Sequence, residues 1–295
     1  MTISQRDEDS DRLPRVPLSM DEAEAEAVLS GAVDVYRAAL GERLVAAYAL
    51  GSLAHGGYSP LVSDIDLGLI VEDPTRPEDP ERIQAVADRE RAKGSPLSGR
   101  LSVFWGTPST LRGEQPGGRF PPLDRLDLIE NGRLLAGTDA RLDLSRPSAE
   151  ELLVSGAEFA LGSLAGARAG AEPRAAGPGS LRPVAEYAVR EIRRPELLLA
   201  RGVRRVTKTV LFPVRFLFTA ATGDVGTNDA AAAWYLADPE APAAMLVAAA
   251  LSWRTGALDD DEAATELLRE QLVPLYMHYI DDNIRRLDAV GRAEL

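Results

Sequence analysis

The sequence predicts an α+β fold in which a sheet-forming N-terminal half precedes an all-helical C-terminal half. Three short, largely apolar runs, residues 44–50, 63–71 and 100–105, are separated by glycine, proline and charged residues, as buried strands are. After Pro147 the apolar residues recur at helical spacing instead. This change of periodicity divides the chain into two parts of different architecture.

The first part is expected to form one domain over residues 19–146. Residues 1–18, which precede it, are polar and acidic and are expected to form a flexible arm. An amphipathic helix is predicted over 19–40, before the first strand. A surface helix that starts with proline is predicted over 80–93, between the second and third strands.

The second part is expected to form a helical domain over residues 147–295. A stretch rich in glycine, proline and alanine, 165–183, predicts a linker or loop within it. Pro213 predicts a kink in the helix that contains it. The predicted helices cover residues 149–164, 184–192, 195–222, 229–237, 241–254 and 261–292.

Composition narrows the classes of function. The chain of 295 residues has a formal net charge of −13, no cysteine and two histidines, which excludes disulfides and thiolate metal sites. The acidic balance argues against nucleic-acid binding, which requires a basic surface. It suits a small cationic acceptor, although solubility explains the charge equally well. No apolar run is long enough to span a membrane and the chain starts with no signal-peptide pattern, so a cytoplasmic protein is expected.

The chain is organised around residues 48–73, YALGSLAHGGYSPLVSDIDLGLIVED. Gly51 lets the backbone approach an anion closely, and the Ser52 hydroxyl can donate to phosphate oxygens. Asp64 and Asp66 are two apart in the predicted strand, so their carboxylates should emerge on one face, about 6–7 Å apart. These carboxylates repel each other, and Mg²⁺ relieves such repulsion while it binds substrate phosphates. The alternative, a solvated face of an edge strand, leaves the upstream GS turn unexplained.

This combination of a GS turn, a glycine-bearing loop and an S-D-x-D strand resembles the signature of the DNA polymerase β-type nucleotidyltransferase superfamily. Within it, the chain is most similar to the streptomycin/spectinomycin-type aminoglycoside adenylyltransferases. The similarity extends to LDLIENGRLLAGTDA, VLFPVRFLFTAATGDVGTNDAAAAWYL and LYMHYIDDNI, in that order along the chain. The resemblance implies a nucleotidyltransferase domain with a mixed sheet and flanking helices, followed by a helical bundle that closes over nucleotide and drug.

The resemblance also implies which residues of the motif bind metal and nucleotide. Asp64 and Asp66 would hold Mg²⁺ and take part in catalysis. Gly51, Ser52 and Ser63 would lie against the phosphates of ATP.

In the helical half, the resemblance implies contacts with both substrates. Arg254 would reach the triphosphate and Tyr279 would lie near the adenine, although Tyr279 is equally explained as a packing aromatic. Asp229 would bind the cationic acceptor, although an aspartate at this place in a sequence is commonly a helix N-cap. Lys208 and Arg215 are weaker candidates for the triphosphate, with a salt-bridged helix surface as the alternative.

Further residues of these motifs favour structural roles. His55 lies in the glycine-bearing loop, where it could donate to a phosphate, and a solvent-exposed loop histidine is the preferred interpretation. His278 and Trp234 are interpreted as structural and core residues.

One position departs from the family pattern. Active members carry a third acidic residue on the next strand, and the matching position in RLSVFW holds Ser102. A serine hydroxyl does not ionise near neutral pH and cannot serve as the general base without activation. Asp127 or Glu130 could replace the missing carboxylate from another element. Otherwise the site binds nucleotide without transferring it.

The sequence therefore predicts a Mg²⁺-dependent transferase that moves AMP from ATP to a hydroxyl of an aminoglycoside-like acceptor, as antibiotic-resistance enzymes of this family do. A degenerate nucleotidyltransferase that only binds nucleotide or a small molecule is the main alternative, favoured by Ser102. An AMP-transferring antitoxin or protein modifier is disfavoured because such minimal proteins lack a large helical half. Partners other than the small-molecule acceptor, whether nucleic acid or membrane, are not expected, and the protein should be a monomer or homodimer.

Overall fold

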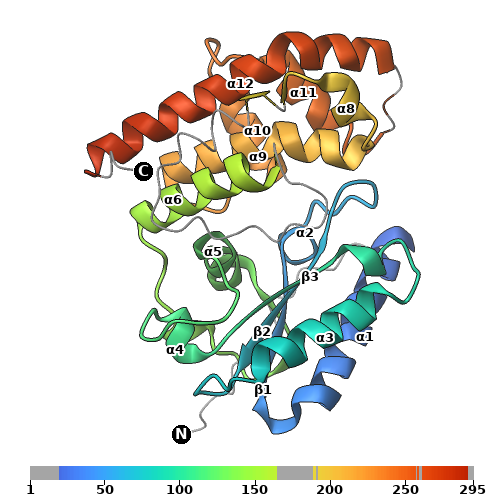
Figure 1. Cartoon of the computed structure of the whole chain (residues 1–295), viewed down its shortest axis with the longest axis vertical. Coiled ribbons are helices and arrows are strands. Elements are labelled where there is room, and N and C mark those ends of the chain that lie inside the picture. The colour runs from blue at the N-terminus through green and yellow to red at the C-terminus, as the bar shows by residue number, and fades with distance from the viewer. Residues whose placement is uncertain (1–19, 165–188, 191, 257, 259–260, 292–295) are drawn as a thin grey trace, which may run out of the picture.

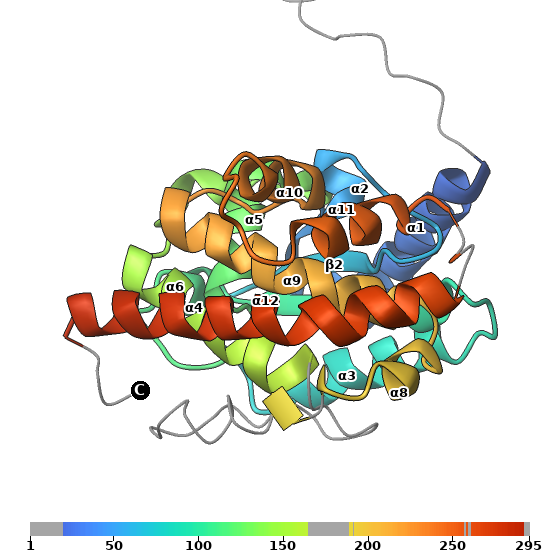
Figure 2. The same cartoon turned by 90° about the horizontal axis from the view of Figure 1, so that it is seen from above.

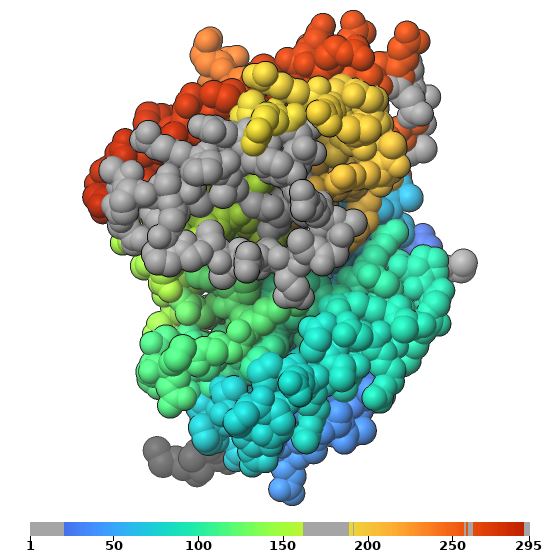
Figure 3. Space-filling view, in the orientation of Figure 1, coloured from blue at the N-terminus to red at the C-terminus, as the bar shows by residue number. Residues whose placement is uncertain are grey.

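The computed structural model describes residues 20–164, 189–190, 192–256, 258 and 261–291. Figure 1 shows a helical half stacked on a half built around a sheet, and Figure 3 shows the same division in space-filling form. The predicted α+β fold class is confirmed: a mixed sheet with flanking helices is followed by helices alone. The arm predicted over 1–18 and the linker predicted over 165–183 lie outside the described residues.

The sheet has four strands in the order β3-β2-β1-β4. Its strands are β1 (Leu44–Leu50), β2 (Ile65–Val71), β3 (Leu101–Gly106) and β4 (Arg133–Gly137). β1 is antiparallel to both of its neighbours, whereas β2 and β3 are parallel. Consequently β1 ends where β2, β3 and β4 begin, and this edge of the sheet is the one that faces the helical half.

Helices cover both faces of the sheet. α1 (Met20–Leu40) and α3 (Asp79–Arg91) pack on one face, and α4 (Pro108–Leu111) and α5 (Pro122–Asn131) pack on the other. Side chains alternate along each strand, so Ala47 and Ala49 of β1 face the first pair of helices. Ala46 and Tyr48 face the second pair. The apolar cores on the two faces of the sheet therefore hold in place the edge of the sheet at which the acidic motif lies.

The helical half contains α6 (Ala149–Glu158), α8 (Pro195–Leu199), α9 (Val203–Thr222), α10 (Asn228–Leu236), α11 (Ala244–Ser252) and α12 (Asp261–Ala289). A π-helical segment, Phe159–Leu164, continues α6. α12 runs the length of this half and packs against α9, as Figure 2 shows from above. None of the helices in the described ranges is long and apolar enough to cross a membrane.

Two predicted elements differ from those in the structure. The single helix predicted over 195–222 is two helices, because the chain leaves helical geometry at Gly202, whose φ is +83°. The second strand begins at Ile65 rather than at residue 63, so Asp64 precedes the strand. The remaining short helices are α2 (Ser52–His55) and the 3₁₀ turns Gly41–Arg43, Ser98–Arg100 and Arg141–Asp143.

Candidate active site

The glycine of the GS turn is held in a conformation and a space that exclude other residues. Gly51 has φ +59°, and a Cβ atom built on it would lie 2.5 Å from Oδ2 of Asp66. Its N–H donates to Oδ2 of Asp127 at 2.6 Å. Ser52 follows as the first, half-buried residue of the short helix α2. The turn is thus hydrogen-bonded to a carboxylate from α5 and lies against a second one, from β2.

The glycine-bearing loop is held by its serines and by the helical half. The N–H of Ser59 donates to Oγ of Ser63 at 3.0 Å, and Oγ of Ser59 donates to the backbone carbonyl of Arg254. The structure therefore shows Ser63, predicted to lie against the phosphates, in a loop-stabilising contact. The guanidinium of Arg254 also donates to the carbonyl of Gly57 at 2.6 Å. These bonds join the loop to the segment that follows α11.

Asp64 is bound by two cations from α9. Arg204 donates to its Oδ1 and Lys208 donates to its Oδ2. Burial opposes ionisation of Asp64, but Lys208 and Arg204 outweigh burial and lower its pKa. Asp64 is therefore a carboxylate that joins the two halves of the chain.

Asp66 lies in the opposite electrostatic environment. Burial and the nearby charges of Asp64 and Asp124 raise its pKa well above the ordinary value, with a smaller contribution from Asp127. Asp124 and Asp127 both belong to α5, so this helix brings its acidic side to the end of β1. Burial and then the neighbouring carboxylates thus disfavour the ionised form of Asp66.

Asp124 itself has a strongly perturbed pKa. Burial and then the charge of Asp127 raise the pKa of Asp124 to about 7, although Arg215 and Arg119 oppose the rise. Both oxygens of Asp127 accept hydrogen bonds, from the Gly51 N–H and from Asn131. Of the two replacements considered for the missing carboxylate, Asp127 lies near the site. Glu130 instead pairs with Arg146 at 2.7 Å.

Ser102 occupies the position that the sequence assigned to it. It is the register partner of Asp66 in the parallel pair of β2 and β3. Its neighbours Leu101 and Val103 are buried in the core under α1 and α3, on the other face of the sheet. Ser102 therefore projects on the same face as Asp66, and the predicted register is confirmed. The strand position next to Asp66 carries no carboxylate.

Arg215 lies farther along α9 and is held among the same acids. Its Nε donates to the carbonyl of Gly226. The pKa of Arg215 is lowered by burial, and the negative charges of Asp127, Asp66 and Asp124 oppose this shift. The guanidinium therefore lies within the electrostatic field of these three aspartates. The pKa of His55 is also lowered, first by burial, against the opposing effect of Asp127. His55 is half-buried, which corrects its interpretation as a solvent-exposed residue.

Asp229 lies at the junction of the halves and is not the cap of its helix. The N-cap of α10 is Thr227, whose side chain accepts from the N–H of Ala230. Asp229 instead accepts from Nη1 of Arg254 at 3.1 Å and remains 66% exposed. The N-cap alternative is therefore wrong, because the threonine two residues earlier fills that position. Asp229 is thus an exposed carboxylate beside the glycine-bearing loop, with Arg254 already bound to both of its oxygens.

Two aromatic residues differ from their predicted roles. Tyr279 is fully buried in the core of the helical half, and its hydroxyl donates to the carbonyl of Gly156 at 2.7 Å. This structure gives it no access to a nucleotide, so the packing alternative accounts for it. Trp234 is 39% exposed and contacts the edge of Phe218, so it is not a core residue.

Sequence reasoning missed Arg204 and Asp124. Arg204 stands one helical turn before Lys208 and eleven residues before Arg215, and this spacing puts the three cations on one side of α9. Asp124 stands three residues before Asp127 and likewise shares its side of α5. Both spacings are visible in the sequence, but nothing local says that the two helix sides meet at the same edge of the sheet.

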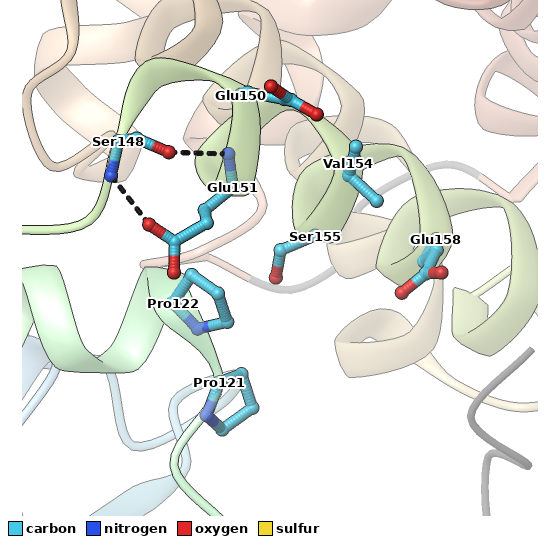
Figure 4. Close-up of a pocket in the computed structure, with 8 residues that line it drawn as sticks. All are labelled: Pro121, Pro122, Ser148, Glu150, Glu151, Val154, Ser155 and Glu158. Atoms are coloured by element: carbon cyan, nitrogen blue, oxygen red, sulfur yellow. Dashed lines mark hydrogen bonds between the residues drawn. The ribbon is translucent and has the colours of Figure 1, made fainter. Parts of the chain in front are cut away.

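A cavity of about 500 Å³ lies apart from these residues, between the start of α5 and α6. Figure 4 shows that its lining includes Pro121, Pro122 and the acidic side chains of α6. Glu151 of this cavity forms a capping box with Ser148 and accepts from Arg125. Glu151 in the acidic lining therefore has a structural role at the start of α6. Neither Asp64 nor Asp66 lines this cavity.

Comparison with known proteins yields structural likeness only. No family model matches the chain, and no curated protein sequence matches it. Nine chains from solved structures are similar to it. One is a spectinomycin adenyltransferase from Enterococcus faecialis solved with ATP and spectinomycin, 15% identical over 86% of this chain and 99% of that chain, with a TM-score of 0.49. A likeness of this degree assigns neither a family nor an activity.

Proposed function

We propose that the protein is a nucleotidyltransferase that moves AMP from ATP to a hydroxyl of a small cationic acceptor. One observation carries the proposal: Asp64 of the S-D-x-D motif is bound by two cations of α9, and Asp66 of the same motif lies against the GS turn. Carboxylates that can hold a metal opposite cations that can hold phosphates form a site suited to a metal-bound polyphosphate. The sequence resemblance to aminoglycoside adenylyltransferases supports the same reaction and an aminoglycoside-like acceptor.

The donor set fits one Mg²⁺ ion shared with a substrate. No group of three or more histidine, aspartate or glutamate side chains within the described residues is placed to hold a metal alone. Asp64 and Asp66 would hold it, because Mg²⁺ commonly takes one or two carboxylates and completes its shell with phosphate oxygens and water. The raised pKa of Asp66, due to burial and then to Asp64, marks negative charge that a dication would offset. When bound, the ion would neutralise charge that develops on the phosphates.

The residues of this chain would then position an in-line displacement. Ser52 would donate to the phosphates, Gly51 would let them approach the turn closely, and the exposed carboxylate of Asp229 would dock the cationic acceptor. The acceptor oxygen forms a bond with the α-phosphorus while the bond from this phosphorus to pyrophosphate breaks. The hydroxyl proton passes to a carboxylate, and pyrophosphate leaves with the electron pair.

We assign the proton to a carboxylate of α5, because Ser102 leaves β3 without one. Asp124 is preferred to Asp127, since both oxygens of Asp127 already accept hydrogen bonds. A base works best when its pKa lies near the working pH, and the pKa of Asp124 is raised to about 7, mainly by burial.

The alternative function is nucleotide binding without transfer, and Ser102 is the observation that favours it. A general base typically contributes about 10²–10⁴-fold to a rate, so its loss would leave a slow or inactive enzyme. The α5 carboxylates weigh against this alternative because they restore acidic groups beside Asp66.

The test is a pair of measurements on the full chain. Thermal shifts with ATP, GTP, CTP and UTP, each with and without Mg²⁺, should show stabilisation only when nucleotide and metal are both present. Pyrophosphate release should then appear on addition of an aminoglycoside or spectinomycin-type acceptor. Binding with no release for any acceptor would favour the alternative, and no binding of any nucleotide would refute both functions.

A further inference from the structure

We propose that Arg204 and Lys208 bind the polyphosphate of the nucleotide, and that in the ligand-free chain they occupy Asp64 in place of the metal. The inference rests on the proposed function, because it assigns residues to the same site. It makes metal and nucleotide binding interdependent, since each ligand releases the partners that the other needs.

The first support is the geometry of the ion pairs. Arg204 and Lys208 stand four residues apart on α9, so both side chains reach one carboxylate from one side of the helix. Each takes a different oxygen of Asp64, so about two of the four lone-pair sites of that carboxylate are occupied. A metal can use Asp64 fully only when these cations move away.

The second support is that the ion pairs of Arg204 and Lys208 with Asp64 are expected to contribute little to folding stability. Lys208 is 16% exposed and Asp64 is 26% exposed, so both groups lose much of their hydration. An ion pair in such a place roughly balances its desolvation cost, and apolar residues would stabilise the junction at least as well. Nε of Arg204 is also buried and has no hydrogen-bond partner among the residues that the structure describes. Leaving a buried donor unpaired costs free energy, and a hydrogen bond to a phosphate oxygen would offset this cost.

The third support is charge balance across the site. Burial raises the pKa of Asp66, and Lys208 acts against this rise as it also lowers the pKa of Asp64. The Lys208 amine therefore lies close enough to interact electrostatically with both motif carboxylates. A polyphosphate adds further negative charge to this edge and requires cations close to it. Arg254, which the sequence assigned to the triphosphate, already donates to Asp229 and to the Gly57 carbonyl. Arg204 and Lys208 are therefore the better-placed cations.

The experiment separates this role from a structural one by the sign of its effects. Lys208→Met and Arg204→Met keep much of each apolar stem and remove the charge. Calorimetric titrations of Mg²⁺ alone, ATP with EDTA, and Mg²⁺ with ATP are made on each variant. We expect the affinity for Mg²⁺-ATP to fall about 10–100-fold, because each variant loses charge-assisted hydrogen bonds. The affinity for Mg²⁺ alone should instead rise several-fold, because Asp64 is released.

Control variants complete the design. Arg201→Met removes an exposed charge near the start of α9 and should leave all three titrations unchanged. Lys208→Arg keeps the charge and should retain most of the affinity for Mg²⁺-ATP. Asp64→Asn should strengthen the binding of metal-free inorganic triphosphate, since it frees both cations and removes a repelling charge.

Two failures are distinguishable. If the parent binds Mg²⁺-ATP and both methionine variants bind it equally well, the inference is wrong and the proposed function stands. A parallel loss of affinity for Mg²⁺ alone and for Mg²⁺-ATP, with a lower melting temperature, would also overturn it, because it would mark a structural role. If the parent binds no nucleotide under any condition, the proposed function fails, and the inference fails with it.

Discussion

Asp124→Asn is expected to stabilise the ligand-free protein at pH 8 and to have a smaller effect at pH 5. Burial and the charge of Asp127 raise the pKa of Asp124 from 3.8 to about 7. A carboxyl whose pKa is higher in the folded chain takes up a proton on folding. Its contribution to stability therefore falls as the pH rises from about 4 to about 7, and the penalty is complete above that range. Asparagine has nearly the same shape and carries no charge, so it removes the penalty.

The magnitude follows from the same pKa. The difference between 3.8 and about 7, at about 1.4 kcal/mol for each pKa unit, sets an upper limit of about 4 kcal/mol. Asp124 keeps part of its surface in water, and nearby side chains can rearrange around the charge, so we expect about 1–2 kcal/mol at pH 8. Each kcal/mol corresponds to a rise in melting temperature of about 2–4 °C for a chain of this size.

The assay is a denaturant or thermal unfolding curve of parent and variant at pH 5 and pH 8, without metal or nucleotide. Asp34→Asn is the matched control, because it removes the same charge from an exposed position on α1. A gain that is equal at both pH values would refute the electrostatic explanation. A loss of stability at pH 8 would mean that Arg215 and Arg119 outweigh burial and keep Asp124 ionised in the folded chain.

Three further predictions concern the ligands. Asp66→Asn should abolish the Mg²⁺-dependent stabilisation by ATP without lowering the melting temperature of the ligand-free chain, and a parental response to Mg²⁺-ATP in thermal shifts would contradict the metal role. Asp229→Ala should weaken binding of a polycationic acceptor about tenfold or more at low salt while ATP affinity changes little, with the difference shrinking as salt rises. Calorimetry that finds equal losses for both ligands would argue against an acceptor role for Asp229. Ser102→Glu should raise Mg²⁺-dependent AMP transfer by up to about 10²–10⁴-fold only if the parent lacks a base; with Asp124 as the base, the gain, measured as pyrophosphate release, should be small. Inhibition by this change in a parent that already turns over fast would mean that another residue supplies the base.

Local features of the site could be predicted from the sequence because their causes lie within a few residues. Apolar runs and glycine placed β1, the GS turn and β2 close to their observed bounds. The alternation of side chains in RLSVFW was enough to put Ser102 beside Asp66 once the two strands paired. Capping was less predictable: Thr227 and Asp229 both suit the start of α10, and only the backbone geometry shows that Thr227 is the N-cap.

The partners of the site residues were decided by how the two halves pack. Asp64 meets cations 140 and 144 residues away, and no local pattern records such a contact. Tyr279 is in the core because the side of α12 that carries it packs against α6. Its place in a family motif had instead implied a position near the adenine. The sequence by itself thus determined which residues lie on one strand, one turn or one side of a helix, since these follow from backbone periodicity. Tertiary packing alone decided which charges face each other, because the field at Asp66 arises from elements that are distant along the chain.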